Sequence, residues 1–85
     1  MRLTSAQMGL LCDIGLDGPG VRRPGGVTSG SGLRFQCRTA DALEMAGLVY
    51  YEPMSDYTYS ITLSGRGTAR YEAWKARKRR YLVGK

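Results

Sequence analysis

Histidine is absent from this 85-residue chain, and its absence excludes several kinds of active site. Histidine is the commonest general base, the usual partner of a nucleophilic serine or cysteine, and the commonest metal ligand. The acidic residues are scattered singly, with no close pair on an evident common face. The sequence therefore predicts a protein that is not an enzyme, with no catalytic residues, no metal site and no cofactor.

Cysteines and long apolar runs are also scarce. Cys12 and Cys37 form neither a CxxC pair nor another metal-ligand spacing. Reduced thiols in a cytoplasmic chain are the simplest interpretation, whereas a single disulfide would require an oxidising compartment. Because no run of about 18 apolar residues is present, no transmembrane helix is expected. The N-terminus is a poor signal peptide, since polar residues interrupt its apolar part.

Acidic residues are nearly missing from the end of the chain. Residues 66–85 contain eight basic side chains and only Glu72 as an acid, a net charge of +7, whereas residues 1–65 sum to −1. A concentrated basic segment indicates a nucleic acid, an anionic membrane surface or an acidic protein as partner. The alternative is a solvated terminal helix. The apolar face of this segment is too narrow for membrane insertion, so no membrane partner is expected.

The first half of the chain shows one clear helix signal. Thr4 begins an expected helix over residues 4–14, with Gln7 at the capping-box position. Residues 15–32 contain seven glycines and two prolines, which predicts a long, mobile surface loop. This loop matches neither the P-loop nor the dinucleotide-binding fingerprint. Residues 33–37 alternate apolar and polar side chains and fit either a short extended piece or the lead-in to a helix.

The second half of the chain has a chemical signal at each boundary. Its expected elements are a helix over residues 38–46, a strand over 48–52, a strand over 57–63 and a helix over 64–82. Thr39 is the expected cap of the first helix, and Gly47 is the left-handed residue after it. Pro53 is expected to end the first strand because proline cannot donate to a ladder. Ser64 is the expected cap of the last helix.

Two short phrases stand at these boundaries, Leu43-Glu44-Met45-Ala46-Gly47-Leu48-Val49 and Ile61-Thr62-Leu63-Ser64-Gly65-Arg66-Gly67. They resemble phrases of the winged helix-turn-helix family, in particular bacterial and phage regulators of the multiple-antibiotic-resistance-regulator type. The resemblance implies a small α+β winged-helix domain over residues 1–85: helix, long loop, helix, β-hairpin wing and basic C-terminal helix. Family members carry a second helix where this chain has its glycine-rich segment.

The resemblance also implies a function, that of a non-enzymatic DNA-binding protein, a small transcriptional regulator of phage or mobile-element origin. Residues 34–39 are expected to approach the DNA groove, and the cations of the loop and of the terminal helix are expected to contact phosphate. The candidate residues for binding double-stranded DNA are Arg22, Arg23, Arg34, Gln36, Arg38, Thr39, Arg70, Arg77, Lys78, Arg79 and Arg80.

The alternative function is a winged-helix protein-binding module, for example a phage inhibitor of a host nucleic-acid machine such as an anti-CRISPR-type protein. The expected wing carries Glu52 and Asp56 and no basic residue, which suits a protein partner better than a phosphate backbone. Tyrosine and tryptophan are favoured anchors at protein interfaces, so Tyr57, Tyr59 and Trp74 are the candidate partner-binding residues. A homodimer formed through the terminal helix is compatible with both functions.

Overall fold

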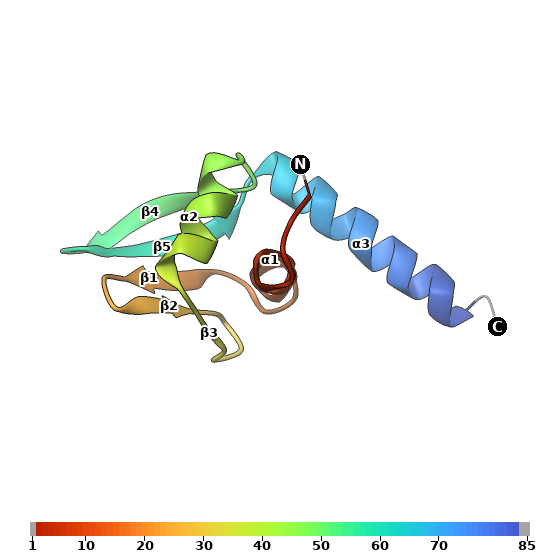
Figure 1. Cartoon of the computed structure of the whole chain (residues 1–85), viewed down its shortest axis with the longest axis horizontal. Coiled ribbons are helices and arrows are strands. Elements are labelled where there is room, and N and C mark those ends of the chain that lie inside the picture. The colour runs from red at the N-terminus through yellow and green to blue at the C-terminus, as the bar shows by residue number, and fades with distance from the viewer. Residues whose placement is uncertain (1, 84–85) are drawn as a thin grey trace.

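The computed structural model describes residues 2–83, with side chains described as far as Lys78. This part of the chain is an α+β fold of three helices and five strands (Figure 1), as expected for the fold class. The elements in chain order are α1 Ser5–Asp17, β1 Gly20–Arg23, β2 Gly26–Thr28, β3 Arg34–Phe35, α2 Cys37–Met45, β4 Val49–Ser55, β5 Thr58–Leu63 and α3 Gly65–Val83.

The start of α1 confirms the predicted capping box. The Gln7 backbone N–H donates to Thr4 Oγ1 at 3.2 Å, and the Thr4 backbone N–H donates to Gln7 Oε1 at 3.0 Å. These two bonds satisfy donors that the first turn of a helix leaves unpaired. The helix continues to Asp17, beyond its predicted end at Ile14, and is closed by Gly18 with φ 91°.

The glycine-rich segment is not a long loop, and that prediction is wrong. After the end of α1, residues 20–28 form the antiparallel hairpin β1–β2, with Pro24 and Gly25 in its turn. Val27 of this hairpin is 1% exposed and belongs to the hydrophobic core. Strand β1 also pairs with β5, far along the chain. This long-range pairing and the burial of Val27 stabilise strands whose local glycine content disfavours them.

The five strands form one antiparallel sheet in the order β3-β2-β1-β5-β4. The core lies between one face of this sheet and helices α1 and α2, which also contact each other. The largest fully buried side chains are Leu10 and Leu11 of α1, Leu43 of α2, Val27 of β2 and Ile61 of β5.

The start of α2 differs from the prediction. Residues 33–37 contain both structures that the alternation allowed, since β3 spans Arg34–Phe35 and α2 begins at Cys37. The N-cap is Gln36, without a side-chain capping bond, and not Thr39. Thr39 lies inside the helix and is buried, because the helix starts two residues earlier than its best local capping signal. Gly47 follows the helix with φ 77°, as predicted for a left-handed residue.

Pro53 does not end β4, and this prediction is also wrong. The strand runs from Val49 to Ser55, and Pro53 pairs with Tyr59 of β5. Strand β4 is at the edge of the sheet, where one side of the backbone has no ladder partner, so proline is tolerated there. Tyr57 lies in the β4–β5 turn with φ 59°, a conformation uncommon for an aromatic residue.

The start of α3 confirms Ser64 as its cap. The Gly67 backbone N–H donates to Ser64 Oγ at 3.0 Å, and the Ser64 hydroxyl donates to the carbonyl of Gly47 at 2.6 Å. The two phrases that carry the family resemblance therefore contact each other at the junction of α2, β4 and α3. The segment between α1 and α2 forms strands where the resemblance implied a loop or a further helix.

Candidate nucleic-acid interface

The register of the sheet sends neighbouring side chains of β1 to opposite faces. Arg22 pairs with Val27, whose side chain is buried in the core, so Arg22 lies on the helix-covered face. Arg23 follows it and therefore lies on the other face, together with Thr28 and its partner Arg34. We call this second face the outer face. Arg23 and Arg34 are both exposed on it.

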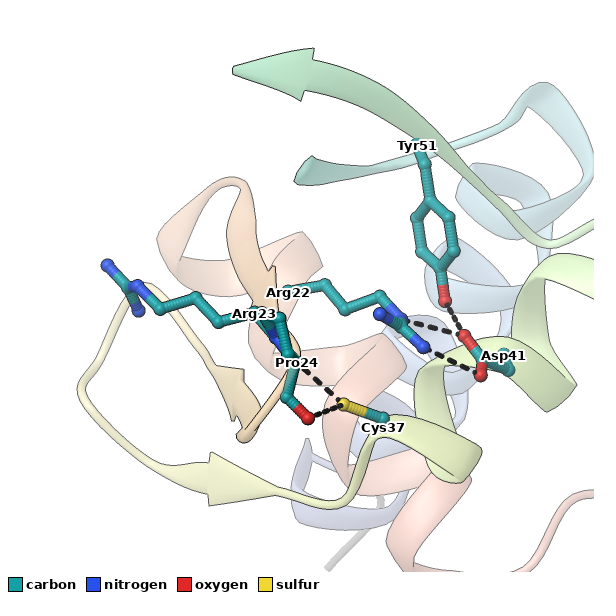
Figure 2. Close-up of polar contacts among 6 residues, drawn as sticks. All are labelled: Arg22, Arg23, Pro24, Cys37, Asp41 and Tyr51. Carbon is teal, nitrogen blue, oxygen red and sulfur yellow. Dashed lines mark hydrogen bonds and ion pairs between the residues drawn. The ribbon is translucent and has the colours of Figure 1, made fainter. Parts of the chain in front are cut away.

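Arg22 is bound to α2 by a bidentate ion pair. Its Nε lies 2.8 Å from Asp41 Oδ1, and its Nη2 lies 3.0 Å from Asp41 Oδ2 (Figure 2). The Tyr51 hydroxyl donates to the same carboxylate at 2.6 Å. The hydrogen bonds from Arg22 and Tyr51 hold the pKa of Asp41 below its ordinary value. Burial, and the bond to Asp41, raise the pKa of Tyr51.

A second contact joins the β1–β2 turn to α2. Cys37 Sγ, in the first turn of α2, lies 3.1 Å from the carbonyl oxygen of Arg23 and 3.8 Å from that of Pro24 (Figure 2). The thiol therefore donates to the backbone of the turn, although S–H is a weak donor. Together with the Arg22–Asp41 pair, this contact fixes the hairpin against α2 on both sides of Arg23.

The outer face contains an open cleft at the end of this hairpin, with a volume of about 550 Å³. Its lining residues come from the β1–β2 hairpin and its turn, from β3 and from the residue before α2. Its lining residues are Arg23, Gly25, Gly26, Val27, Thr28, Arg34, Phe35 and Gln36. None of these is acidic. Among the residues with described side chains, Arg23 and Arg34 have no ion-pair partner.

The cleft unites three candidate residues, and a fourth is adjacent. Arg23, Arg34 and Gln36 line it. Arg38 Nε donates to Gln36 Oε1 at 2.6 Å, so Arg38 is directly beside it. Arg22 lies on the helix-covered face of the sheet, where it is paired with Asp41. Thr39 is 8% exposed and is buried within α2, so its side chain is not available at the surface as the predicted contact with a DNA groove requires.

The remaining candidate cations lie on α3, which extends away from the body of the domain on the side opposite the β1–β2 turn (Figure 1). Arg77 and Lys78 are exposed, and Arg70 is half-buried. The Lys78 ammonium lies 5.6 Å from the centre of the Trp74 ring. The candidates Arg79 and Arg80 lie outside the residues whose side chains the structure describes. The predicted cations therefore form two separate groups.

The three candidate partner-binding aromatic residues do not form one surface. Tyr57 is 76% exposed at the β4–β5 turn, next to the exposed Met54. Tyr59 pairs in register with Arg22 and packs against Tyr51, with ring centres 5.9 Å apart. Trp74 lines a groove between α1 and α3. Tyr57 alone is presented freely to a partner.

Sequence reasoning missed the residues that hold the cleft in place. Asp41, Tyr51 and Cys37 connect α2 to β4 and to the β1–β2 turn. Asp41 is separated from Arg22 by 19 positions, and no local pattern pairs them. The sequence contained one signal for this contact. Asp41 lies among residues expected to approach DNA, and an acid at such a position indicates a basic partner within the fold.

Membrane-spanning helices and metal sites were also sought in the part of the chain that the structure describes. No helix in this range is long and apolar enough to cross a membrane. Among the described residues, no group of three or more cysteine, aspartate or glutamate side chains could hold a metal ion. Cys12 and Cys37 are both free. Comparison with protein-family models, curated proteins and solved structures found nothing that matches this chain.

Proposed function

We propose that this protein is a non-enzymatic DNA-binding protein that acts as a small regulator. The observation that carries the proposal is helix α3, which leaves the body of the domain and presents Arg77 and Lys78 to solvent. Glu72 is the single acid among residues 66–85. Phosphate neutralisation by such cations supplies most of the affinity of non-specific DNA binding. The regulatory role comes from the resemblance of the two phrases at residues 43–49 and 61–67 to winged helix-turn-helix regulators.

The arginines near the cleft support the same proposal from another part of the fold. Arg23, Arg34 and Arg38 are exposed, and Asp41, the acid nearest in the chain to Arg34 and Arg38, is neutralised by Arg22. Asp41 therefore does not repel phosphate as strongly as its position in the sequence suggested. Acidic Glu52 lies across the sheet on β4, the strand at the opposite edge from β3.

The test is a titration of duplex binding against salt concentration. We expect the affinity of the wild-type protein to fall steeply between ~50 and ~200 mM salt. The double variant Arg77→Gln/Lys78→Gln should lower the slope of log K against log salt by about 1.8, since each lost phosphate contact removes about 0.9. The charge-matched control is Arg2→Gln/Arg66→Gln. Failure of the wild-type protein to bind duplex DNA at ~50 mM salt would exclude the proposal.

The alternative, a protein-binding module, has less support from the geometry. Its three anchor candidates point to different parts of the molecule, and Trp74 packs beside Tyr71, with ring centres 6.1 Å apart. Hot spots of protein interfaces normally cluster near the centre of one patch. The observation that favours a protein partner is confined to the β4–β5 turn, where Met54 and Tyr57 are exposed together.

A further inference from the structure

We propose that the cleft on the outer face is a phosphate-binding site for the backbone of the bound nucleic acid. It would be a second contact surface, separate from α3. This inference rests on the proposed function, since the phosphate is taken to belong to the DNA that α3 contacts. Arg23 of β1 and Arg34 of β3 are the residues that would bind the phosphate, and both line the cleft.

The lining of the cleft selects for an anion. Arg23 lies on β1 and Arg34 on β3, with β2 between these two strands, and the lining has no carboxylate. Gln36 uses its side-chain oxygen to accept the bond from Arg38 at 2.6 Å, which leaves its NH₂ group to donate. Thr28 adds a hydroxyl donor. The polar side chains thus present positive charge and donors, which match the acceptor oxygens of a phosphate.

The walls of the cleft are held in position before any ligand binds. The Arg22–Asp41 pair binds β1 to α2 immediately before Arg23. The Cys37 thiol binds the carbonyl of Arg23 itself to the first turn of α2. The backbone of Arg34 is held in place by the pairing of β3 with β2. Because the backbone is already ordered, binding costs mainly the ordering of two arginine side chains.

The size of the cleft fits a sugar-phosphate unit. Its volume of about 550 Å³ is within the range of ligand sites and exceeds what a single phosphate group needs. Gly25 contributes no side chain, and a Cβ placed on it would meet no atom within 4 Å. Gly25 therefore leaves its part of the lining open, and it would not obstruct a backbone that continues past the site.

The first experiment compares duplex affinity between charge-matched variants. Arg23→Gln/Arg34→Gln should weaken duplex binding on the order of tenfold at ~100 mM salt and lower the salt slope by about 1.8. Arg2→Gln/Arg66→Gln removes the same charge elsewhere and should change affinity less than about threefold. Both altered arginines of the cleft are exposed, so the variant should fold, as circular dichroism would verify. Equal effects of the two double variants would overturn the proposal.

A second variant pair tests the cleft without removing an arginine. Gly25→Asp adds a carboxylate to the lining of the cleft, and Gly25→Asn adds a neutral side chain of the same shape at that position. Both side chains fit sterically because a Cβ at position 25 meets no atom within 4 Å. We expect Gly25→Asp to lose duplex affinity on the order of tenfold relative to Gly25→Asn. Indistinguishable affinities of these two variants would contradict a phosphate in the cleft.

Titration with inorganic phosphate distinguishes two possible ligands of the cleft, the phosphate of the DNA backbone and a free phosphate ion. Amide NMR signals of Gly25, Gly26 and Thr28 should shift with duplex DNA in the wild type and remain in place in Arg23→Gln/Arg34→Gln. Shifts with inorganic phosphate alone, without any effect of the variant on duplex affinity, would overturn the backbone source. If the cleft variants bind duplex normally while Arg77→Gln/Lys78→Gln does not, this inference fails and the proposed function stands. Absence of duplex binding by the wild type overturns both.

Discussion

Asp41 is the residue on which the arrangement around the cleft depends. Its carboxylate accepts hydrogen bonds from Arg22 of β1 and from Tyr51 of β4, while Asp41 itself belongs to α2. Strand β1 and the consecutive elements α2 and β4 therefore meet at one side chain. The side chain is 43% exposed, so water screens the ion pair and its net contribution to stability is moderate.

Replacing Asp41 by asparagine should lower stability at neutral pH by about 1 kcal/mol, because Arg22 loses its charged partner. For a domain of this size, that corresponds to a fall in Tm of about 4–8 °C. Thermal unfolding followed by circular dichroism would measure it. Glu44→Gln is the matched control, since Glu44 is an exposed acid of the same helix, and it should leave Tm unchanged.

The effect of Asp41→Asn on stability should depend on pH, and the direction of this dependence follows from the pKa shifts of Asp41 and Tyr51. Folding lowers the pKa of Asp41, so its contribution is present at neutral pH and disappears as pH falls below about 4. Folding raises the pKa of Tyr51, so its neutral form favours the folded state until pH rises above about 10. The difference in Tm between wild type and Asp41→Asn should therefore shrink in acid. A difference that stayed constant down to about pH 2 would show that the ion pair is not its source.

At the scale of elements, close backbone contacts constrain the junction between α2, β4 and α3. The Ser64 backbone N–H donates to the carbonyl of Leu48 at 3.0 Å, and Gly67 lies against that same carbonyl. A Cβ on Gly67 would overlap the carbonyl oxygen of Leu48. Helix α3 can therefore approach β4 only because position 67 has no side chain.

Gly67→Ala should destabilise the fold by about 2 kcal/mol or more, because α3 must move away from Leu48. Gly65→Ala is the matched control in the same helix turn, since a Cβ there meets nothing within 4 Å. The control should be neutral or more stable by up to about 1 kcal/mol, as expected for alanine in place of glycine in a helix. Urea denaturation of both variants would measure the difference. Equal stabilities would mean that the junction adjusts at little cost.

The junction also explains which parts of the fold the sequence could predict. Thr4, Gly47 and Ser64 act on backbone groups a few residues away, so their caps and turns were correctly inferred. The hairpin at residues 20–28 depends on pairing with β5 and on burial of Val27, which no local pattern of glycines reveals. Tertiary context outweighed local propensity there.

The candidate site was predictable in composition but not in arrangement. Arg23, Arg34 and Gln36 were singled out as DNA-binding candidates, and the structure brings them together at one cleft. The opposite roles of Arg22 and Arg23 depend on strand alternation, which could not be applied to a segment assigned as a loop. Thr39 was misplaced because the helix begins before its strongest capping residue.

The whole molecule is elongated, with principal extents of 49, 24 and 19 Å. The β1–β2 turn, whose residues line part of the cleft, and the end of α3 that carries Arg77 and Lys78 lie toward opposite ends of the molecule (Figure 1). A ligand that touches both groups must therefore be long. Duplex DNA advances about 3.4 Å for each base pair, so about 14 base pairs match the longest dimension.

Duplex affinity should therefore depend on length. We expect binding to strengthen from about 8 to about 14 base pairs and to level off beyond that, apart from the statistical gain in positions. Fluorescence anisotropy with blunt duplexes at constant salt would measure it. Arg23→Gln/Arg34→Gln should level off at a shorter length, since only the α3 end then contributes. A plateau at about 8 base pairs in the wild type would indicate that one end alone makes contact.

The edges of the sheet have a consequence for how copies of the chain behave toward one another. Strand β3 spans only Arg34–Phe35, and β4 carries Pro53 together with a register shift between Pro53 and Ser55. An exposed edge recruits further strands when it is long, flat and rich in free backbone donors. One edge here is too short, and the other lacks a donor and is irregular. The proline that was expected to end a strand instead protects the sheet against edge-to-edge aggregation.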